Sequence, residues 1–216
     1  MWLESASVSL SANMDAGAIV EAYDAHRNLP QVEGSGIVVK VLKDDTNGLQ
    51  HQKFLDQHQL KFERHEHPAV MTVAESELLV PKLPGAKTKN LFLRDKKGLK
   101  HFLVTIPAAL SVNLNQLGDV LGAGRLGFAS ADRLLTHLGV TPGSVSMLGL
   151  VNDTAHNVQF VIDQTLWDAE FVQAHPLINT ATMIIPHAEL LRFLAATGHA
   201  PQIISVPAQT AEDVAP

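Results

Sequence analysis

The pattern of apolar and polar positions predicts a β-hairpin near the middle of the chain. Residues 91–93 (Leu-Phe-Leu) are apolar at consecutive positions, so both faces of a strand there would be covered, as in a central strand. The charged run at 95–98 ends in glycine and supplies a tight turn, and 101–106 is the expected returning strand. On the first strand, Lys89 shares a face with the two leucines and Asn90 shares the other face with the phenylalanine.

The same patterning predicts helices and strands on both sides of this hairpin. Helical spacing, capping residues and terminal glycines predict helices at 50–59, 72–79, 115–121, 131–138 and 186–197, with one helical turn or two between 163 and 171. Strands are expected at 61–66, 111–114, 145–151, 158–162 and 183–185, with 145–151 paired to 158–162. This order predicts an α+β fold with a mixed, mostly antiparallel central sheet and flanking helices.

Three segments differ in composition. Residues 1–48 are predicted to be an N-terminal extension whose role the pattern does not indicate; within it, 36–42 is strand-like and a polar break follows at 44–48. Residues 49–206 form the expected main domain. From 207 to 216 the sequence predicts a disordered tail.

Length and composition narrow the class of protein. A chain of 216 residues can bury a sizeable core. The net charge of −6 argues against a sequence-reading DNA-binding protein. Because the sequence has neither a long apolar run nor a signal-peptide pattern at its start, we expect a cytoplasmic protein without a membrane partner. The absence of cysteine excludes disulfides, thiol nucleophiles and thiolate metal sites.

Positive charge is concentrated on the predicted hairpin. Seven of the 16 Lys and Arg residues lie between Lys82 and Lys100, against one acidic residue, Asp95. The patch is either a solvated sheet edge kept soluble by lysines or a site for phosphate groups. Lys89, at the mouth of a buried strand, is likewise either a cation for an anionic ligand or a salt-bridged strand lysine.

Other candidate chemistry is sparse. No nucleophile elbow, P-loop, zinc-protease motif or dinucleotide fingerprint is present. His65 and His67 share a strand face, but they lack a third ligand at a useful spacing, so no metal site is predicted. Ser144 lies in a turn without a histidine and an acid placed by spacing. His175, beside a proline in a polar loop, is either a hydrogen-bonding or acid/base group of a site or a structural loop histidine.

The hairpin sequence at 87–98, Lys-Thr-Lys-Asn-Leu-Phe-Leu-Arg-Asp-Lys-Lys-Gly, closely resembles the free-standing prolyl-tRNA editing domains of the YbaK/ProX type. Further resemblances follow in the same order at 64–70, 124–130, 138–145 with 150–153, and 175–182. Together they cover roughly residues 50–201. The Thr-Lys-Asn-Leu and His-Pro-Leu patterns are more similar to the branch that deacylates Ala-tRNA(Pro) than to the branch that acts on Cys-tRNA(Pro).

The resemblance implies an aminoacyl-tRNA editing hydrolase that acts in trans on the ester of mischarged tRNA(Pro), first of all Ala-tRNA(Pro). Such editing is needed because a pocket built for proline cannot strongly reject a smaller apolar amino acid. The attacking group in this family is a water assisted by the ribose hydroxyl of the substrate, without a metal or cofactor. The implied partners are aminoacyl-tRNA(Pro) and, further, prolyl-tRNA synthetase or an elongation factor.

The resemblance also implies residue roles. Lys89 would contact the aminoacyl ester or the terminal phosphate, Asn90 would hold the ester end, and His175 would sense the small side chain. The backbone of a four-residue turn would flank the terminal adenosine; its members are Gly143, Ser144, Val145 and Ser146. Three lysines past the strand would at most contact the acceptor stem weakly; they are Lys96, Lys97 and Lys100.

One departure from the family pattern leaves alternatives open. Met147 stands where the family commonly has a proline, so the preceding loop is expected to be less rigid. The chain could then be a non-catalytic tRNA- or synthetase-binding module of the same fold. Specificity for Cys-tRNA(Pro) and a small-molecule sensor that ignores tRNA are the other readings.

Overall fold

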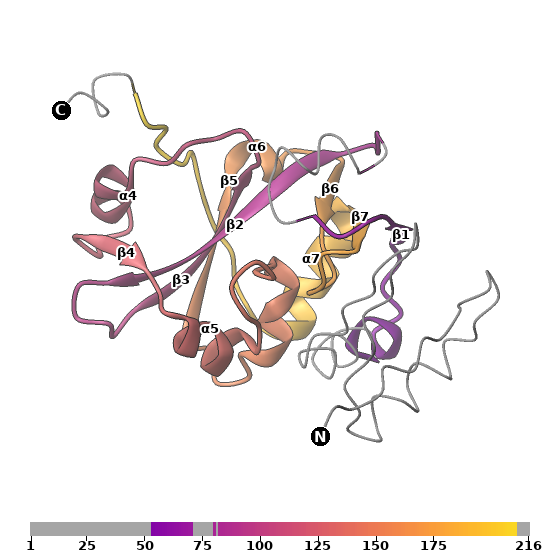
Figure 1. The fold of residues 1–216 in the computed structure, drawn as a ribbon, viewed down its shortest axis with the longest axis horizontal. Helices are drawn as coiled ribbons and strands as arrows, with labels where there is room; N and C mark the ends of the chain where they lie inside the picture. Colours follow the sequence, from indigo (N-terminus) through magenta and orange to yellow (C-terminus); the bar gives the residue numbers. More distant parts are fainter. Residues whose placement is uncertain (1–52, 71–79, 81, 211–216) are drawn as a thin grey trace, which may run out of the picture. The chain divides into compact units, whose positions relative to one another are not determined.

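The computed structural model describes residues 53–70, 80 and 82–210, all of which belong to one compact unit (Figure 1). The proposed extension at 1–48, with its strand-like run, and the helix expected at 72–79 lie outside the described residues.

The predicted central hairpin is confirmed. Strand β2 (Ala86–Asp95) pairs antiparallel with β3 (His101–Pro107) in a register that places Leu91 opposite Val104. Asp95 closes the turn, since its Oδ1 accepts hydrogen bonds from the backbone N–H groups of Leu99 at 2.7 Å and Lys100 at 3.0 Å. These backbone donors, that of Lys100 first, hold the pKa of Asp95 below its ordinary value.

The hairpin lies inside an eight-stranded mixed sheet with the order β1-β7-β6-β2-β3-β5-β8 and with β4 paired to β2 (Figure 1). The remaining strands are β1 (Glu63–Glu66), β4 (Leu126–Phe128), β5 (Val158–Asp163), β6 (Phe171–Ala174), β7 (Ala181–Pro186) and β8 (Gln202–Ile204). Four of its seven pairings are antiparallel, and β2–β6, β3–β5 and β5–β8 are parallel. The predicted mixed, mostly antiparallel sheet is therefore confirmed.

Helices cover the sheet on both faces. They are α4 (Leu114–Val120), α5 (Ala131–Leu138), the 3-10 helix η1 (Met147–Asn152), α6 (Gln164–Trp167) and α7 (His187–Thr197). Phe92 belongs to the apolar core that contains residues of α5, η1 and α7, whereas Leu93 belongs to the core beneath α4. Strand β2 is thus buried on both faces, as its sequence predicts. No helix in the described ranges is long and apolar enough to cross a membrane.

Capping residues set the helix ends much as expected. Ser130 accepts a hydrogen bond at the start of α5, and Gly139 ends this helix with a left-handed φ of 64°. Gly198 ends α7 in the same way, with φ 74°.

The strand predicted at 145–151 is wrong. This apolar run forms η1, whose first residue, Met147, is fully buried, and Ser146 caps it by accepting from the backbone N–H of Leu148. A continuous apolar run fits a buried helical turn as well as a buried strand, so its pattern alone does not decide. Strand β5, its expected partner, pairs instead in parallel with β3 and β8.

The ordered contacts extend past residue 206. Ala208 forms an isolated bridge with Val112, and the backbone N–H of Gln209 donates to the Ser111 carbonyl at 2.7 Å. The tail predicted from 207 therefore begins too early, because 207–210 pair with the segment before α4. That segment, expected to be a strand at 111–114, forms only the bridge; residues 211–216 lie outside the described part.

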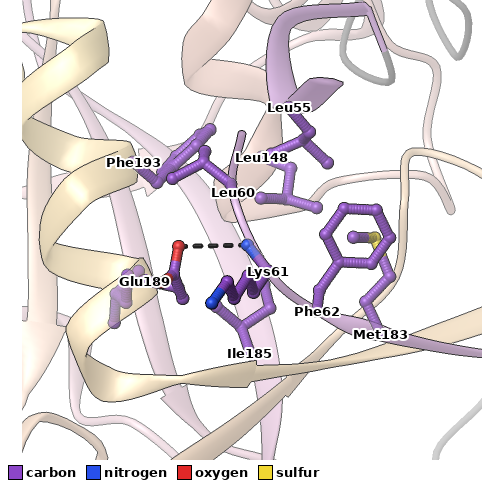
Figure 2. A pocket seen from close by; sticks show the side chains of 10 residues that line it. Leu55, Leu60, Lys61, Phe62, Leu148, Met183, Ile185, Glu189 and Phe193 are labelled. Atoms are coloured by element: carbon purple, nitrogen blue, oxygen red, sulfur yellow. Dashed lines mark hydrogen bonds between the residues drawn. The ribbon is translucent and has the colours of Figure 1, made fainter. Parts of the chain in front are cut away.

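Residues 53–62 pack against α7 around a small apolar void (Figure 2). The void measures about 10 Å³ and is lined by Leu55, Leu60 and Phe193, among others. Glu189 of α7 fixes this segment by accepting from the backbone N–H of Lys61 at 3.0 Å, the contact drawn in Figure 2. The void is large enough for at most one water molecule, so we do not consider it a ligand site.

Candidate active site

A much larger cavity, of about 320 Å³, lies among the first half of β2, the ends of β6 and β7, and the turn before η1. Five of the predicted site residues line it, namely Lys89, Asn90, Gly143, Val145 and His175. The fold therefore brings together three segments that are distant in the sequence. The assignment of an ester site to this cavity stays a prediction, and the chemistry that each group can perform depends on its contacts.

Lys89 places a positive charge at this cavity. Its Nζ donates to the backbone carbonyl of Leu110, in the turn after β3, at 2.8 Å. An ammonium group has three donors, so two N–H bonds remain for a ligand. Among the described residues, the hydrogen-bond partner of Lys89 Nζ is a backbone carbonyl and not a carboxylate. This contact does not support the interpretation of Lys89 as a salt-bridged strand lysine.

Asn90 is held by a buried hydroxyl. Thr105, its cross-strand neighbour on β3, is fully buried and donates from Oγ1 to Asn90 Oδ1 at 2.7 Å. With Oδ1 engaged in this way, the Nδ2 amide is the group of Asn90 that can donate to a ligand. A fixed donor of this kind suits a carbonyl oxygen on which negative charge develops.

His175 follows β6 and connects the cavity to the turn before η1. Its Nε2 lies 2.8 Å from the carbonyl oxygen of Val145; because a carbonyl can only accept, Nε2 carries the proton. Burial lowers the pKa of His175 below its ordinary 6.5, so the ring is neutral near pH 7. Nδ1 is then an acceptor, and it is buried with no hydrogen-bond partner among the described residues.

The turn before η1 is held by its backbone and by burial. Gly143 adopts φ 93°, a conformation that favours glycine, and the N–H of Ser144 donates to the Thr141 carbonyl at 3.1 Å. Ser144 and Ser146 are buried and are not among the residues that line the cavity. Met147 occupies the first helical position, which suits proline; here its fully buried side chain anchors the turn instead.

The three lysines assigned to the acceptor stem lie elsewhere. Lys96, Lys97 and Lys100 are exposed on the turn between β2 and β3. At about 3.3 Å per residue, Lys96 is roughly 23 Å along the strand from Lys89. One small ligand therefore cannot contact both Lys89 and these lysines.

Sequence reasoning missed several residues that line the cavity, above all His67 and Thr182. His67 was considered only as a metal ligand, yet its Nδ1 lies 2.8 Å from the Pro68 carbonyl and its Nε2 lies 3.0 Å from Thr182 Oγ1. No group of three or more metal-binding side chains occurs in the part of the chain that the structure describes. Both residues fall in segments that resemble the editing domains, which was the available signal for finding them.

Gln173, a further lining residue, fixes the start of β2. Its Nε2 lies within hydrogen-bond distance of three successive carbonyls, those of Leu83 at 2.9 Å and of Pro84 and Gly85 at 3.2 Å. The Gln173 carbonyl in turn accepts from Thr88 Oγ1 at 2.6 Å. One buried side chain thus orders the approach to the strand that carries Lys89.

Comparisons with known proteins agree with this picture. The family model described as "Aminoacyl-tRNA editing domain" matches residues 67–193, and a model of a protein family of unknown function matches residues 1–90. The prolyl-tRNA editing protein ProX of Acetoanaerobium sticklandii is 36% identical over 145 residues, covering 67% of this chain and 88% of that protein. The prolyl-tRNA synthetase associated domain-containing protein 1 of Mus musculus is 40% identical over 144 residues, covering 65% and 85%.

Two solved structures share the fold. One, a candidate trans-editing enzyme for prolyl tRNA synthetase, is 19% identical with a TM-score of 0.58 and covers 79% of this chain and 100% of its own. The other, a hypothetical protein, is 21% identical with a TM-score of 0.57, and the match covers 73% of this chain and 98% of that protein. At these identities the likeness concerns the fold alone.

The chain belongs to the aminoacyl-tRNA editing domain family. Within that family it is similar to the prolyl-tRNA editing protein ProX and to a prolyl-tRNA synthetase associated domain-containing protein, so the resemblance seen in the hairpin sequence is confirmed. The α+β fold and the prediction of an aminoacyl-tRNA editing hydrolase are confirmed with it.

Proposed function

We propose that this protein removes amino acids from mischarged tRNA(Pro) by hydrolysing the ester bond, with Ala-tRNA(Pro) as its preferred substrate. The observation that carries the proposal is a single cavity that joins Lys89 and Asn90 to His175. The family match and the similarity to ProX support the reaction class.

Lys89 and Asn90 act on the ester in this proposal. The Lys89 ammonium and the Asn90 Nδ2 amide are two donors on consecutive residues of β2, and both residues line the cavity. Placed near the ester carbonyl, they stabilise the negative charge that develops on its oxygen as water attacks. Their engagement with Leu110 and Thr105 fixes both groups before the substrate binds.

The lining of the cavity supports a small amino acid. Ala108, Ala174 and Ala181 line it together with Val145, so a wall of short apolar side chains is available to an alanyl group. His175 holds one edge of this wall through the Val145 carbonyl and, being neutral, adds no charge. Cys-tRNA(Pro) is the second candidate, because a cysteinyl side chain is only slightly larger.

The tRNA itself is proposed to follow the hairpin. The backbone of 143–146 flanks the terminal adenosine, while the exposed lysines of the β2–β3 turn contact backbone phosphates of the acceptor stem. Exchanging those lysines for glutamine should weaken tRNA binding and reduce its salt dependence without changing the rate of the bound substrate. If the salt dependence in a filter-binding titration is unchanged, these lysines do not contact the tRNA. The three residues are Lys96, Lys97 and Lys100.

The alternative of a non-catalytic module rested on Met147. Since Met147 is fully buried and begins a capped helical turn, the loop before it is anchored. We therefore favour turnover over binding alone. Prolyl-tRNA synthetase and an elongation factor stay as proposed partners that would deliver or receive the tRNA.

One assay tests the proposal. The purified protein is incubated with tRNA(Pro) charged separately with Ala, Cys, Ser and Pro, and the loss of each ester is followed over time. We expect Ala-tRNA(Pro) to be deacylated fastest and Pro-tRNA(Pro) to be spared. Faster hydrolysis of Cys-tRNA(Pro) than of Ala-tRNA(Pro) would assign the specificity to cysteine. Salt-dependent tRNA binding without hydrolysis would favour the non-catalytic module. A protein that neither binds nor hydrolyses these tRNAs would favour the small-molecule sensor.

A further inference from the structure

The cavity contains a hydroxyl–imidazole pair to which neither the resemblance nor the proposed function gives a role. His67 follows β1 and is nearly buried, with 9% of its surface exposed, and Thr182 lies on β7. Both line the cavity that Lys89, Asn90 and His175 line. The Thr182 Oγ1 and His67 Nε2 atoms are 3.0 Å apart.

The contacts of His67 define its tautomer and the direction of the hydrogen bonds. Nδ1 lies 2.8 Å from the Pro68 carbonyl, an acceptor only, so Nδ1 carries the proton in the neutral ring. Nε2 is then the basic nitrogen, and the Thr182 hydroxyl donates its proton to it. The oxygen of Thr182 keeps its lone pairs for a second donor. A base oriented by a third group and bonded to a hydroxyl is the arrangement of a proton-transfer pair.

We propose that Thr182 and His67 form a proton relay for the hydrolytic step. This inference rests on the proposed deacylase function and adds a protein route for the proton. A water molecule donates to Thr182 Oγ1 and its oxygen attacks the ester carbonyl carbon. The water proton passes to Thr182 as the Thr182 proton passes to His67 Nε2, and the Pro68 carbonyl stabilises the resulting imidazolium through Nδ1.

The second half of the reaction returns the proton. The bond between the carbonyl carbon and the ribose oxygen breaks, and the proton moves back from His67 through Thr182 to that leaving oxygen. The products are the free amino acid and tRNA with its terminal hydroxyl restored, so no oxidant, metal or further reactant is required. His67 does not touch the substrate in this scheme; it acts through Thr182 and is a positioning residue.

If the His67–Thr182 pair had a purely structural role, it would hold the end of β1 against β7. The experiment must distinguish this structural role from the proton relay. Single-turnover deacylation of Ala-tRNA(Pro) is measured for Thr182→Val, Thr182→Ser and His67→Ala, the last with and without added imidazole. His65→Gln is the matched control, because His65 is the register partner of Thr182 and does not line the cavity. Ionisable groups that share the cavity, Lys87, Lys89 and His175, are left unchanged throughout.

The relay predicts a specific set of rates. Thr182→Val and His67→Ala should each lower the single-turnover rate by about 100-fold or more with little change in KM. Thr182→Ser should stay within about tenfold of the wild type, and imidazole should restore part of the His67→Ala rate. His65→Gln should have the wild-type rate.

Thr182→Val keeps the shape of threonine, so it decides the question even if His67→Ala fails to fold. A Thr182→Val protein that unfolds at the wild-type temperature and deacylates within about threefold of the wild-type rate overturns the relay. In that outcome the proposed function stands. A wild-type protein that deacylates none of the charged tRNAs overturns both proposals together.

Discussion

Replacing Lys89 by methionine isolates the charge at the proposed ester site. Methionine keeps an unbranched side chain on β2, while the ammonium and its hydrogen bond to the Leu110 carbonyl are lost. A hydrogen bond from a charged donor is worth about 1.5–3 kcal/mol of unfolding free energy, and the partial exposure of this one places its contribution at the lower end of that range. A loss this small should leave the protein folded.

The expected effect on the reaction is larger. A donor that stabilises a developing oxyanion contributes about 2.7–4 kcal/mol to the transition state. At about 1.36 kcal/mol for each factor of ten, Lys89→Met should reduce the single-turnover rate by roughly 100-fold to 1,000-fold. If Lys89 contacts the terminal phosphate instead of the ester, the loss should appear as weaker binding with an unchanged rate for the bound substrate.

The assay follows release of labelled alanine from Ala-tRNA(Pro) under single-turnover conditions over a range of protein concentrations. Lys53→Met is the matched control, since it removes the same charge from an exposed lysine that does not line the cavity and is not assigned to tRNA binding. Urea unfolding of both variants separates instability from lost chemistry. A stable Lys89→Met protein with wild-type rate and affinity would refute the role of this lysine.

Three further predictions concern the groups behind the site. Thr105→Val leaves Asn90 Oδ1 without its donor and should slow deacylation by about 10–100-fold, whereas Thr105→Ser should retain activity. Both are measured as the single-turnover rate at saturating protein. Met147→Ala removes a fully buried side chain and should lower the unfolding free energy by about 2–5 kcal/mol in urea titrations; a loss below about 1 kcal/mol would show that burial does not anchor the turn. Because burial lowers the pKa of His175 from 6.5, the unfolded chain binds the proton first as the pH falls. The stability due to the neutral ring is therefore complete above pH 6.5 and declines below it, and His175→Gln should flatten this part of the profile of unfolding free energy against pH.

The sequence predicted the parts of the fold that have strong local signals. Consecutive apolar residues and the charged turn defined the β2–β3 hairpin, and Ser130 with Gly139 defined α5. The run at 145–151 failed because length and apolarity do not separate a buried 3-10 helix from a buried strand. Strands β4, β6 and β8 were not predicted, since runs of three or four residues leave little periodicity to detect.

The candidate site was accessible from the sequence only through resemblance. Periodicity placed Lys89 and Asn90 on opposite faces of a strand but could not show that His175 would lie at the same cavity. The pairing of His67 with Thr182 spans 115 residues and depends on the register between β1 and β7, which no local pattern encodes. Contacts of this kind follow from topology, and they appear only when the strands are placed side by side.

The way β2 joins its two neighbours has a consequence for how such a protein can change. Seven residue pairs connect β2 to β3, but only two, at Ala86 and Lys87, connect it to β6. The cavity spans this short junction, with the proposed ester groups on one side and His175 on the other. Substitutions in the packing of β6 and β7 could therefore alter the width of the cavity while Lys89 and Asn90 stay in place. The preference for one amino acid over another could then evolve largely independently of the rate of ester hydrolysis.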